Sequence, residues 1–315
     1  MKRILLAAAT LLFTVVLTAQ QGVLLKLNPE KNKLYRLRSV SEQTVNQTVS
    51  GNTQTVQSKV TSIFSMKMMD MTPDFIVAEV RFDTLITNTN QMGKITSINS
   101  TVEGDIKSSE SSDIMSCIMN RLSRNAVYTK IDNAGKPVEI VNAKMLSDIV
   151  LKDTASITLT EPLASAIKAQ AAGAVSENNL KAMIGNFTWH LPGSEVGVGD
   201  KWAVSDQVNS GGMLLTISTT YRLDAIKGNN ANITAESVIR AADNAPPIRS
   251  AGATVTYNNL TGMNRSSLVI DITTGLVVEQ SARTRISGTL DISAPGFSMQ
   301  MPMDINGETK ISALQ

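Results

Sequence analysis

The sequence predicts a mainly β fold of long antiparallel hairpins in one or more curved sheets, with a helical insert packed on one face. Apolar and polar residues alternate with a period of two over long stretches in both outer parts of the chain, which is typical of half-buried strands. Between these stretches the spacing becomes helical and the composition Ala-rich. A chain of 315 residues with 42% hydrophobic residues is long enough to bury a large core.

This pattern divides the chain into four segments. We assign residues 1–19 to a signal peptide, residues 20–142 to a first β half, residues 143–187 to the helical insert and residues 188–315 to a second β half. The helical insert is expected to cover one face of the sheet or sheets that the two β halves form.

The first residues predict export. Lys2 and Arg3 precede an apolar run over residues 4–17, and small and polar residues follow, with a cleavage site near Ala19. This is the three-part layout of a secretory signal. The run is shorter than the roughly 20 residues that a membrane helix needs. We therefore expect a periplasmic or extracellular protein that is soluble after cleavage and has no integral membrane anchor.

A long hairpin is the clearest prediction in the first β half. Residues 56–68 alternate along one strand, Thr72-Pro73-Asp74 supplies a turn, and residues 76–82 alternate on the return strand. The preceding Gln-, Asn- and Thr-rich residues 44–55 are expected to form a polar hairpin tip.

Helices are predicted from apolar spacing and from capping residues. Ser112 is expected to cap a short helix in the first β half. Within the insert, Pro162 marks a helix start, and Ser176 caps a helix for which Gly185 is the expected stop. Turn residues predict further hairpins over residues 127–141, 215–235 and 268–286.

The two β halves contain similar strand and turn sequences. Residues 62–79 are similar to residues 219–236, and residues 135–139 are similar to residues 275–279. An internal duplication into two related halves explains these matches. Strand alternation alone also produces such matches, so both interpretations stay open.

Several motifs resemble a known family. They are Gly199-Asp200-Lys201-Trp202, the strand of Tyr221, Ile270-Asp271 through Gly275-Leu276-Val277, and Ser287-Gly288-Thr289. Together they resemble a domain family of unknown function found in exported proteins of Gram-negative bacteria. The resemblance covers most of the chain after the signal. It implies a mainly β fold and export, and it brings no assigned activity and no catalytic residues.

Charge and cysteine content argue against several classes of function. Without the signal, 27 of the 29 Lys and Arg residues remain against 27 Asp and Glu residues, so the net charge is about zero. A neutral chain without basic blocks is not expected to bind nucleic acid or an anionic membrane surface. The single cysteine, Cys117, precludes an internal disulfide and lies on an apolar helical face, where we expect a buried thiol.

No pattern of residues predicts a catalytic, metal or cofactor site. His190 is the single histidine, and no Gly-x-Ser-x-Gly motif accompanies it. One histidine and one cysteine cannot form a zinc site, and the acidic residues lack calcium-loop spacing. A hydrolase that uses His190 or paired carboxylates stays open as a hypothesis, because a fold can bring such groups together from distant positions.

Methionine gives the most distinctive pattern. The chain has 15 Met but only 4% aromatic residues, and two predicted strand faces collect several of them. Thioethers adapt to irregular shapes, so these faces either fill a core or line a cavity for an apolar ligand. The candidate ligand-contact residues are Phe64, Met66, Met68, Phe297, Met299, Met301 and Met303.

Three functions are consistent with these observations. The first is a non-enzymatic envelope protein that binds an apolar ligand, such as a lipid, in a Met-lined cavity. The second is a structural or protein-interaction module with another envelope protein as its partner. The third is the hydrolase. No cofactor is expected for the first two, and the sequence favours the first.

Overall fold

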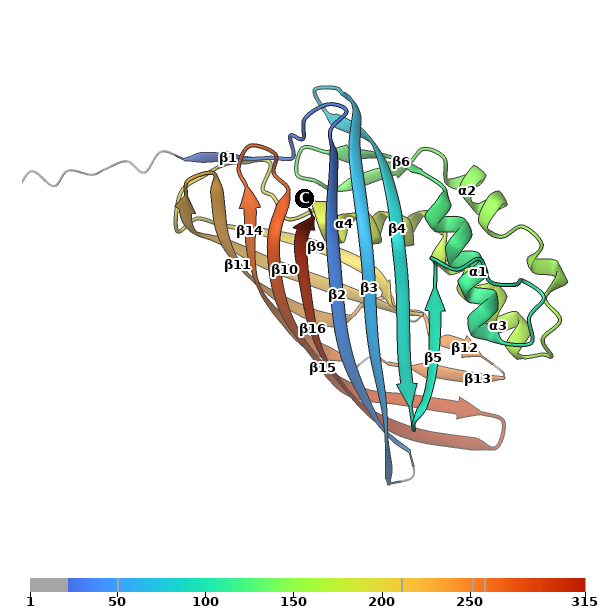
Figure 1. Cartoon of the computed structure of the whole chain (residues 1–315). Coiled ribbons are helices and arrows are strands. Elements are labelled where there is room, and N and C mark those ends of the chain that lie inside the picture. The colour runs from blue at the N-terminus through green and yellow to red at the C-terminus, as the bar shows by residue number, and fades with distance from the viewer. Residues whose placement is uncertain (1–21, 50, 211, 251, 258, 315) are drawn as a thin grey trace, which may run out of the picture.

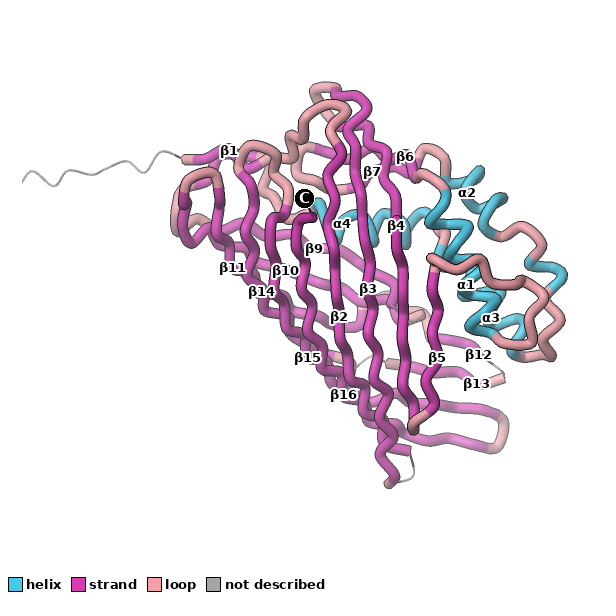
Figure 2. The backbone as a smooth tube through the Cα atoms, in the orientation of Figure 1, coloured by secondary structure: helices cyan, strands magenta, loops and turns pink. Residues whose placement is uncertain are grey.

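A 14-stranded antiparallel sheet forms most of the molecule (Figure 1). The computed structural model describes residues 22–314 except 50, 211, 251 and 258, so the predicted signal peptide lies outside the described residues. Strands contain 57% of the residues and helices 17%, which confirms the predicted mainly β fold. The sheet is curved and open, and the helices lie on one side of it (Figure 2).

The strands are long, as the alternating pattern predicts, and turns between neighbouring strands join most of them. A separate two-stranded sheet pairs β1 (Val23–Leu25) with β8 (Ser194–Val196). The strands of the large sheet are β2 (Leu34–Val49), β3 (Asn52–Met71), β4 (Phe75–Gln91), β5 (Lys94–Asn99), β6 (Val127–Asp132), β7 (Pro137–Ile140), β9 (Lys201–Ser210), β10 (Met213–Lys227), β11 (Asn230–Ala241), β12 (Ile248–Ser250), β13 (Ala253–Thr256), β14 (Thr261–Asp271), β15 (Val277–Ala294) and β16 (Phe297–Leu314).

The two halves of the chain enter the sheet from opposite ends. The spatial order is β7-β6-β4-β3-β2-β16-β15-β14-β11-β10-β9, with β5 also paired to β4 and the β12–β13 hairpin attached to β15. The first half begins in the middle of the sheet at β2 and proceeds to one edge. The second half begins at the opposite edge and returns to the middle, where β16 pairs with β2. One continuous sheet therefore contains both halves, and the duplication stays a prediction.

Two of the four α-helices, α1 and α4, pack on the concave face of this sheet, and the other two pack on them. Helix α4 contacts both β7 and β9, the strands at the two ends of the order, so it bridges the opening of the curved sheet. Helix α1 packs against β4 and β5. The helices are α1 (Ser111–Arg124), α2 (Ala143–Val150), α3 (Leu163–Ala174) and α4 (Glu177–Thr188), with a 3-10 turn at Thr154–Ser156.

The predicted helix caps are only partly correct. Ser176 is the N-cap of α4, as predicted, and its hydroxyl accepts a hydrogen bond from the N–H of Asn179. The predicted cap at Ser112 is wrong, because α1 begins at Ser111 after Glu110, whose side chain makes no capping hydrogen bond. The tertiary contacts of the buried apolar face of α1 fix its start in place of a local cap.

The predicted stop of α4 at Gly185 is also wrong, because the helix continues to Thr188. Tertiary contacts stabilise its last turn. Phe187 stacks on Phe64 of β3 with ring centroids 4.5 Å apart, and the Thr188 hydroxyl donates a 2.7 Å hydrogen bond to the carbonyl of Gly135. These contacts outweigh the helix-ending tendency of a glycine.

The predicted polar hairpin tip over residues 44–55 is the end of the β2–β3 hairpin, with Gly51 in its turn. Strand β2 extends to Val49 and β3 starts at Asn52, so most of this segment is paired strand. Polar side chains support each other across the ladder, since the Thr55 hydroxyl donates a 2.9 Å hydrogen bond to Asn46 Oδ1. Cross-strand polar pairs of this kind stabilise a ladder without burial in a core.

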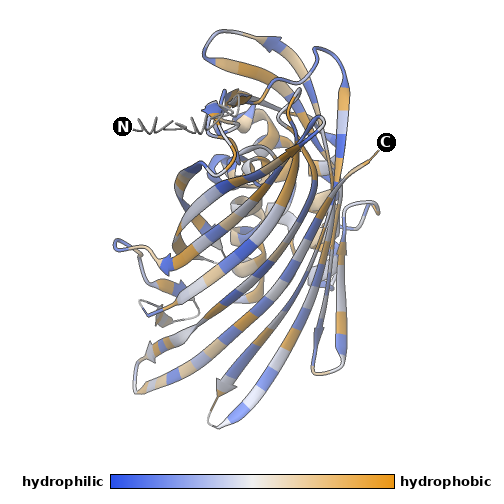
Figure 3. Cartoon of the chain, turned by 90° about the vertical axis from the view of Figure 1, so that its left-hand side faces the viewer, coloured by the Kyte–Doolittle hydropathy of each residue, from blue (hydrophilic) through white to orange (hydrophobic). Residues whose placement is uncertain are grey.

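Buried side chains form two hydrophobic clusters. The first cluster lies between the helices and the sheet, and it includes Phe64, Met66, Ile114, Leu180, Phe187, Leu223, Ile233 and Leu268. The second cluster lies under the loop that contains β12 and β13, and its buried members are Tyr257, Leu260, Leu290, Met303 and Ile305. Figure 3 shows the alternation of hydrophilic and hydrophobic residues along the strands.

Candidate functional site

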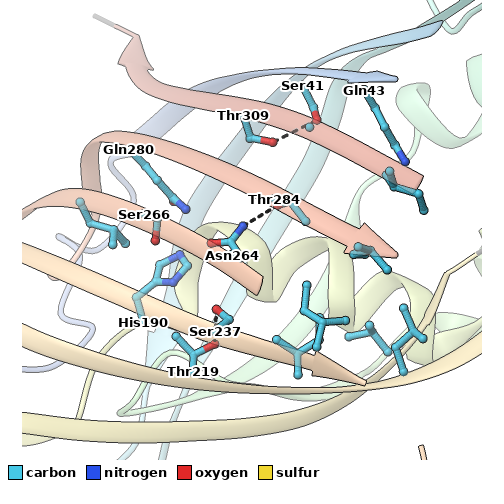
Figure 4. A pocket seen from close by; sticks show the side chains of 18 of the residues that line it. Ser41, Gln43, His190, Thr219, Ser237, Asn264, Ser266, Gln280, Thr284 and Thr309 are labelled. Atoms are coloured by element: carbon cyan, nitrogen blue, oxygen red, sulfur yellow. Dashed lines mark hydrogen bonds between the residues drawn. The ribbon is translucent and has the colours of Figure 1, made fainter. Parts of the chain in front are cut away.

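A cavity of about 350 Å³ opens on the concave face (Figure 4). The apolar side chains that line it are Val208, Leu215, Ile217, Ile239, Leu268, Ile286 and Ile305. The lining residues with polar side chains are Ser41, Gln43, His190, Thr219, Tyr221, Ser237, Asn264, Ser266, Gln280, Thr284 and Thr309, and Gly307 completes the set. Leu268 belongs to the first cluster and Ile305 to the second. The cavity is therefore the part of the concave face that neither cluster fills.

The strand register arranges these residues in rows. Residues directly opposite each other in a ladder share a face of the sheet. One polar row crosses the sheet through successive partners: Thr219, Ser237, Asn264, Thr284, Gly307, Gln43 and Ser58. The neighbouring apolar row is Ile217, Ile239, Gly262, Ile286, Ile305 and Val45. A molecule in the cavity thus meets hydrogen-bonding groups beside aliphatic ones.

Hydrogen bonds between adjacent strands order the polar side chains. The hydroxyls of Thr219 and Ser237 share a hydrogen bond of 2.9 Å, and the amide of Asn264 donates a 2.7 Å bond to Thr284 Oγ1. By contrast, Gln280 has a buried side-chain Oε1 with no hydrogen-bond partner among the described residues. An unpaired buried acceptor is uncommon in folded proteins, and this one belongs to a side chain that lines the cavity.

No charged side chain lines the cavity, and the charges at the ladder-paired positions of β10, β11, β14, β15, β16 and β2 lie on the convex face. There a row of ladder partners contains Glu236, Arg265, Arg283, Glu308, Glu42 and Lys59. Its members form ion pairs, with 3.3 Å between Arg265 and Glu236 and 3.0 Å between Arg283 and Glu308. A larger hollow of about 1230 Å³ runs along these charges. Since exposed, mutually paired charges line it, we do not take it as the ligand site.

His190 lies at one end of the cavity and is held neutral. Its Nε2 donates to the carbonyl of Asn186 over 3.1 Å, which leaves Nδ1 to accept from the hydroxyl of Tyr221 over 3.3 Å. Burial lowers the pKa of His190 to about 4, against an opposing effect of the Asn186 carbonyl. Burial also raises the pKa of Tyr221 to about 12. Both rings are therefore uncharged near neutral pH.

The surroundings of His190 give it a structural role. The indole of Trp202 donates a 3.0 Å hydrogen bond to the backbone carbonyl of His190 and stacks on Tyr221 at 5.5 Å. Neither ring nitrogen of His190 is hydrogen-bonded to a carboxylate. The histidine version of the hydrolase hypothesis required such an acid, so the geometry counts against it.

Cys117 is buried in α1, and burial raises the pKa of its thiol in spite of the nearby Arg121. A thiol of this kind is a poor nucleophile at neutral pH. Among the described residues, no group of three or more His, Cys, Asp and Glu side chains is placed to hold a metal ion. In the same part of the chain, no helix combines the length and apolar character needed to cross a membrane.

The seven residues predicted to contact a ligand are split between two regions. Phe64, Met66 and Met68 are buried in the first cluster. On β16, Met303 is buried in the second cluster, Met301 packs beside it, Met299 is half-buried and Phe297 is 54% exposed. None of the seven lines the cavity. Met303 comes nearest in register, because it shares a face of β16 with Ile305.

Sequence reasoning missed the residues that do line the cavity. A signal was present: Thr219 shares a strand face with Leu215, Ile217, Tyr221 and Leu223. In this strand the hydroxyl at the phase of the core residues lies where the face is not fully packed. The alignment of such hydroxyls into a row depends on the pairing of distant strands, which the sequence pattern does not provide.

Comparison with known proteins gives a family. Residues 73–277 match the model of DUF6263, a family of unknown function. The match covers more than half of the chain, so the chain belongs to this family. No curated protein matches the sequence.

Two solved structures are similar at low identity. A structure of lipid–protein interactions in lipovitellin is 8% identical over 91% of this chain, with a TM-score of 0.41, and this chain spans only 25% of its length. An outer membrane channel of the COG4313 group from Pseudomonas putida F1 is 8% identical, with 91% of this chain and 97% of that chain covered and a TM-score of 0.30. At these scores neither structure identifies a ligand or an activity for this chain.

Proposed function

For this member of the DUF6263 family, we propose that the protein binds an apolar or amphipathic molecule, such as a lipid, on the concave face of its sheet. One observation carries the proposal: about 350 Å³ of the concave face stays unfilled between the two hydrophobic clusters. Ligand cavities of proteins commonly measure about 300–1,000 Å³ and are lined mainly by apolar groups with a few placed polar ones. The volume lies in this range, and the lining is more polar than is usual, with eleven polar side chains beside seven apolar ones, so it suits a molecule with both a polar and an aliphatic part.

The partial exposure of the apolar row supports the proposal. Ile217 and Ile286 are half-buried although both face the same side as the core residues of their strands. Leaving aliphatic surface in water costs about 25 cal/mol per Å². A ligand that covers this row removes that surface from water, which supplies a driving force for binding.

We extend the proposal to the location of the protein. The basic, apolar and small-residue segments at the start of the chain support export and work in the cell envelope. The measurement is the mass of the mature protein purified from its native cells. A mature amino terminus at Gln20 is expected, and an uncleaved Met1 would contradict export by this signal.

Binding is tested with an uncharged hydrophobic dye, Nile red, on protein that has been stripped of bound lipid. Ile217→Trp places an indole in the cavity, and Thr220→Trp places the same group at an exposed position on the convex face of the same strand. We expect wild-type protein and Thr220→Trp to bind the dye and Ile217→Trp to bind at least about tenfold more weakly, which is about 1.4 kcal/mol.

A second pair of variants separates a blocked cavity from a misfolded protein. Ile286→Trp fills the cavity from β15, and Ser287→Trp, on the exposed convex face, is its control. Near-ultraviolet circular dichroism reports whether each variant is folded. Folded wild-type protein that binds neither dye nor extracted lipid would remove the ligand-binding function and favour the structural or interaction module.

A further inference from the structure

The concave face carries no charge over a wide area. The eight adjacent strands from β10 to β4 pair residue by residue at their ladder positions. Every Asp, Glu, Lys and Arg at these positions is out of phase with the cavity residues and faces the convex side, so the concave side presents hydroxyls, amides and aliphatic groups. The tendency of charges to be exposed does not explain why they are confined to the convex side, because a charge on the concave side could also reach water through the open cavity.

A charged group that enters this cavity finds no opposite charge. Moving an ion out of water into a poorly polar site carries a large desolvation cost unless a counter-charge or several hydrogen bonds replace the water. The nearest carboxylate in register is Asp206, the ladder partner of Ile217 on the edge strand β9. Asp206 is half-buried and does not itself line the cavity; its charge disfavours an anion and partly offsets the desolvation cost of a cation, so the anion is expected to be rejected more strongly.

An uncharged group with hydrogens to donate meets the opposite situation. The Oε1 atom of Gln280 is buried and lacks a hydrogen-bond partner. Each hydroxyl of the polar row can also accept a further hydrogen bond beyond the one it makes within the row. Figure 4 shows Gln280, Ser266 and His190 directed into the same part of the cavity. Oε1 itself has almost no exposed surface, so a ligand hydroxyl satisfies this acceptor once the Gln280 amide turns toward the cavity.

We infer that the ligand has an uncharged, hydroxyl- or amide-bearing polar group, which the polar row and Gln280 receive, and an aliphatic part that lies on the apolar row. This inference rests on the proposed ligand-binding function and adds the class of ligand: neutral acylglycerol-like lipids are bound, and their ionised analogues are rejected. The aliphatic part extends toward Ile286 and Ile305, at the second cluster.

The test compares three molecules that share one aliphatic chain: monodecanoylglycerol, decanoate and decylamine. Their affinities for the full chain are measured at pH 7.5 by displacement of Nile red and by calorimetry. We expect the neutral glycerol ester to bind at least about tenfold more tightly than either ion. Equal affinities for all three, with dye binding intact, would overturn the inference and leave the proposed function standing. If the folded wild-type protein did not bind Nile red at all, the proposed function itself would be overturned.

Two variants probe the polar contacts. Gln280→Leu removes the orphan acceptor, and we expect the affinity for monodecanoylglycerol to fall about three- to tenfold relative to the affinity for Nile red. Ser281→Ala, at the exposed neighbouring position, is the control and leaves both unchanged. Unaltered glycerol-ester affinity in folded Gln280→Leu would contradict a role for this side chain.

A third variant reverses the selectivity. Thr284→Lys introduces a cation into the polar row, so decanoate is expected to gain at least about tenfold in affinity and decylamine to lose affinity. Arg285, two positions away from Arg283 on the convex face, already carries a charge without lining the cavity. Arg285→Gln is therefore the control and should leave the three affinities unchanged. No gain for decanoate in folded Thr284→Lys would oppose the electrostatic basis of the inference.

Discussion

The covered end and the open part of the concave face belong to the same strands but differ in their side chains. Strand β10 places Leu223 in the first cluster, Thr219 and Ile217 in the cavity, and Leu215 at the far end. Where helix α4 covers the strands, aliphatic and aromatic residues fill the space. Where no helix covers them, hydroxyls alternate with aliphatic rows. In β10 the hydroxyl at core phase, Thr219, therefore lies in the part of the sheet that is kept open.

The largest expected contrast is in stability. Phe64→Ala removes a ring that is 1% exposed and stacked on Phe187, and such a change costs about 3–5 kcal/mol. Ile217→Ala, in the half-buried apolar row, should cost about 1 kcal/mol or less. The side chain faces the cavity, so its truncation removes few packing contacts. Urea denaturation of ligand-free protein measures both. Similar losses at the two positions would erase the distinction between the covered end and the cavity.

The boundary between the two regions should respond to pH. Burial holds the pKa of His190 at about 4 in the folded protein, below its ordinary value of 6.5. The unfolded chain therefore binds a proton at a higher pH than the folded one. The contribution of neutral His190 to stability is complete above pH 6.5, decreases as the pH falls toward 4, and has lost about 3 kcal/mol there.

The measurement is the free energy of unfolding between pH 8 and pH 4. His190→Gln removes the titrating ring, so its stability should fall less over this interval than that of the wild type. Parallel curves for the two proteins would show that the ring is not kept neutral at the end of the cavity.

The smallest effect is expected on the convex face. The side chains of Arg283 and Glu308 pair over 3.0 Å but are 81% and 58% exposed. Exposed pairs contribute little and are screened by salt, so Glu308→Gln should change stability by about 0.5 kcal/mol or less and leave Nile red binding unchanged. Thermal melts at low and high salt, together with the dye assay, check this. Altered dye binding would mean that the two faces of the sheet are coupled.

Local patterns allowed much of the fold to be predicted. The turn at Thr72-Pro73-Asp74 joins β3, which ends at Met71, to β4, which starts at Phe75. Ser176 caps α4. Both features depend on a few neighbouring residues, whose preferred backbone angles and hydrogen bonds are visible in the sequence.

The errors arose where distant contacts decide. Helix α4 continues past Gly185 because Phe187 and Thr188 find partners on β3 and beside β7. Most of the Met residues that the sequence made prominent lie in the two clusters and Met299 lies in neither, whereas Ser, Thr, Asn and Gln residues line much of the cavity.

The sequence by itself determined the strands and the two faces of each strand, because alternation with a period of two is a property of consecutive residues. Only the tertiary structure decided which strands meet and which part of the concave face is left open. Gln43 and Gly307 lie in one row because the first and last long strands pair, and the cavity exists because α4 covers one end of the sheet and the loop around Tyr257 the other. Contacts between residues far apart in the chain produce no periodic pattern in the sequence, so they cannot be predicted from it in this way.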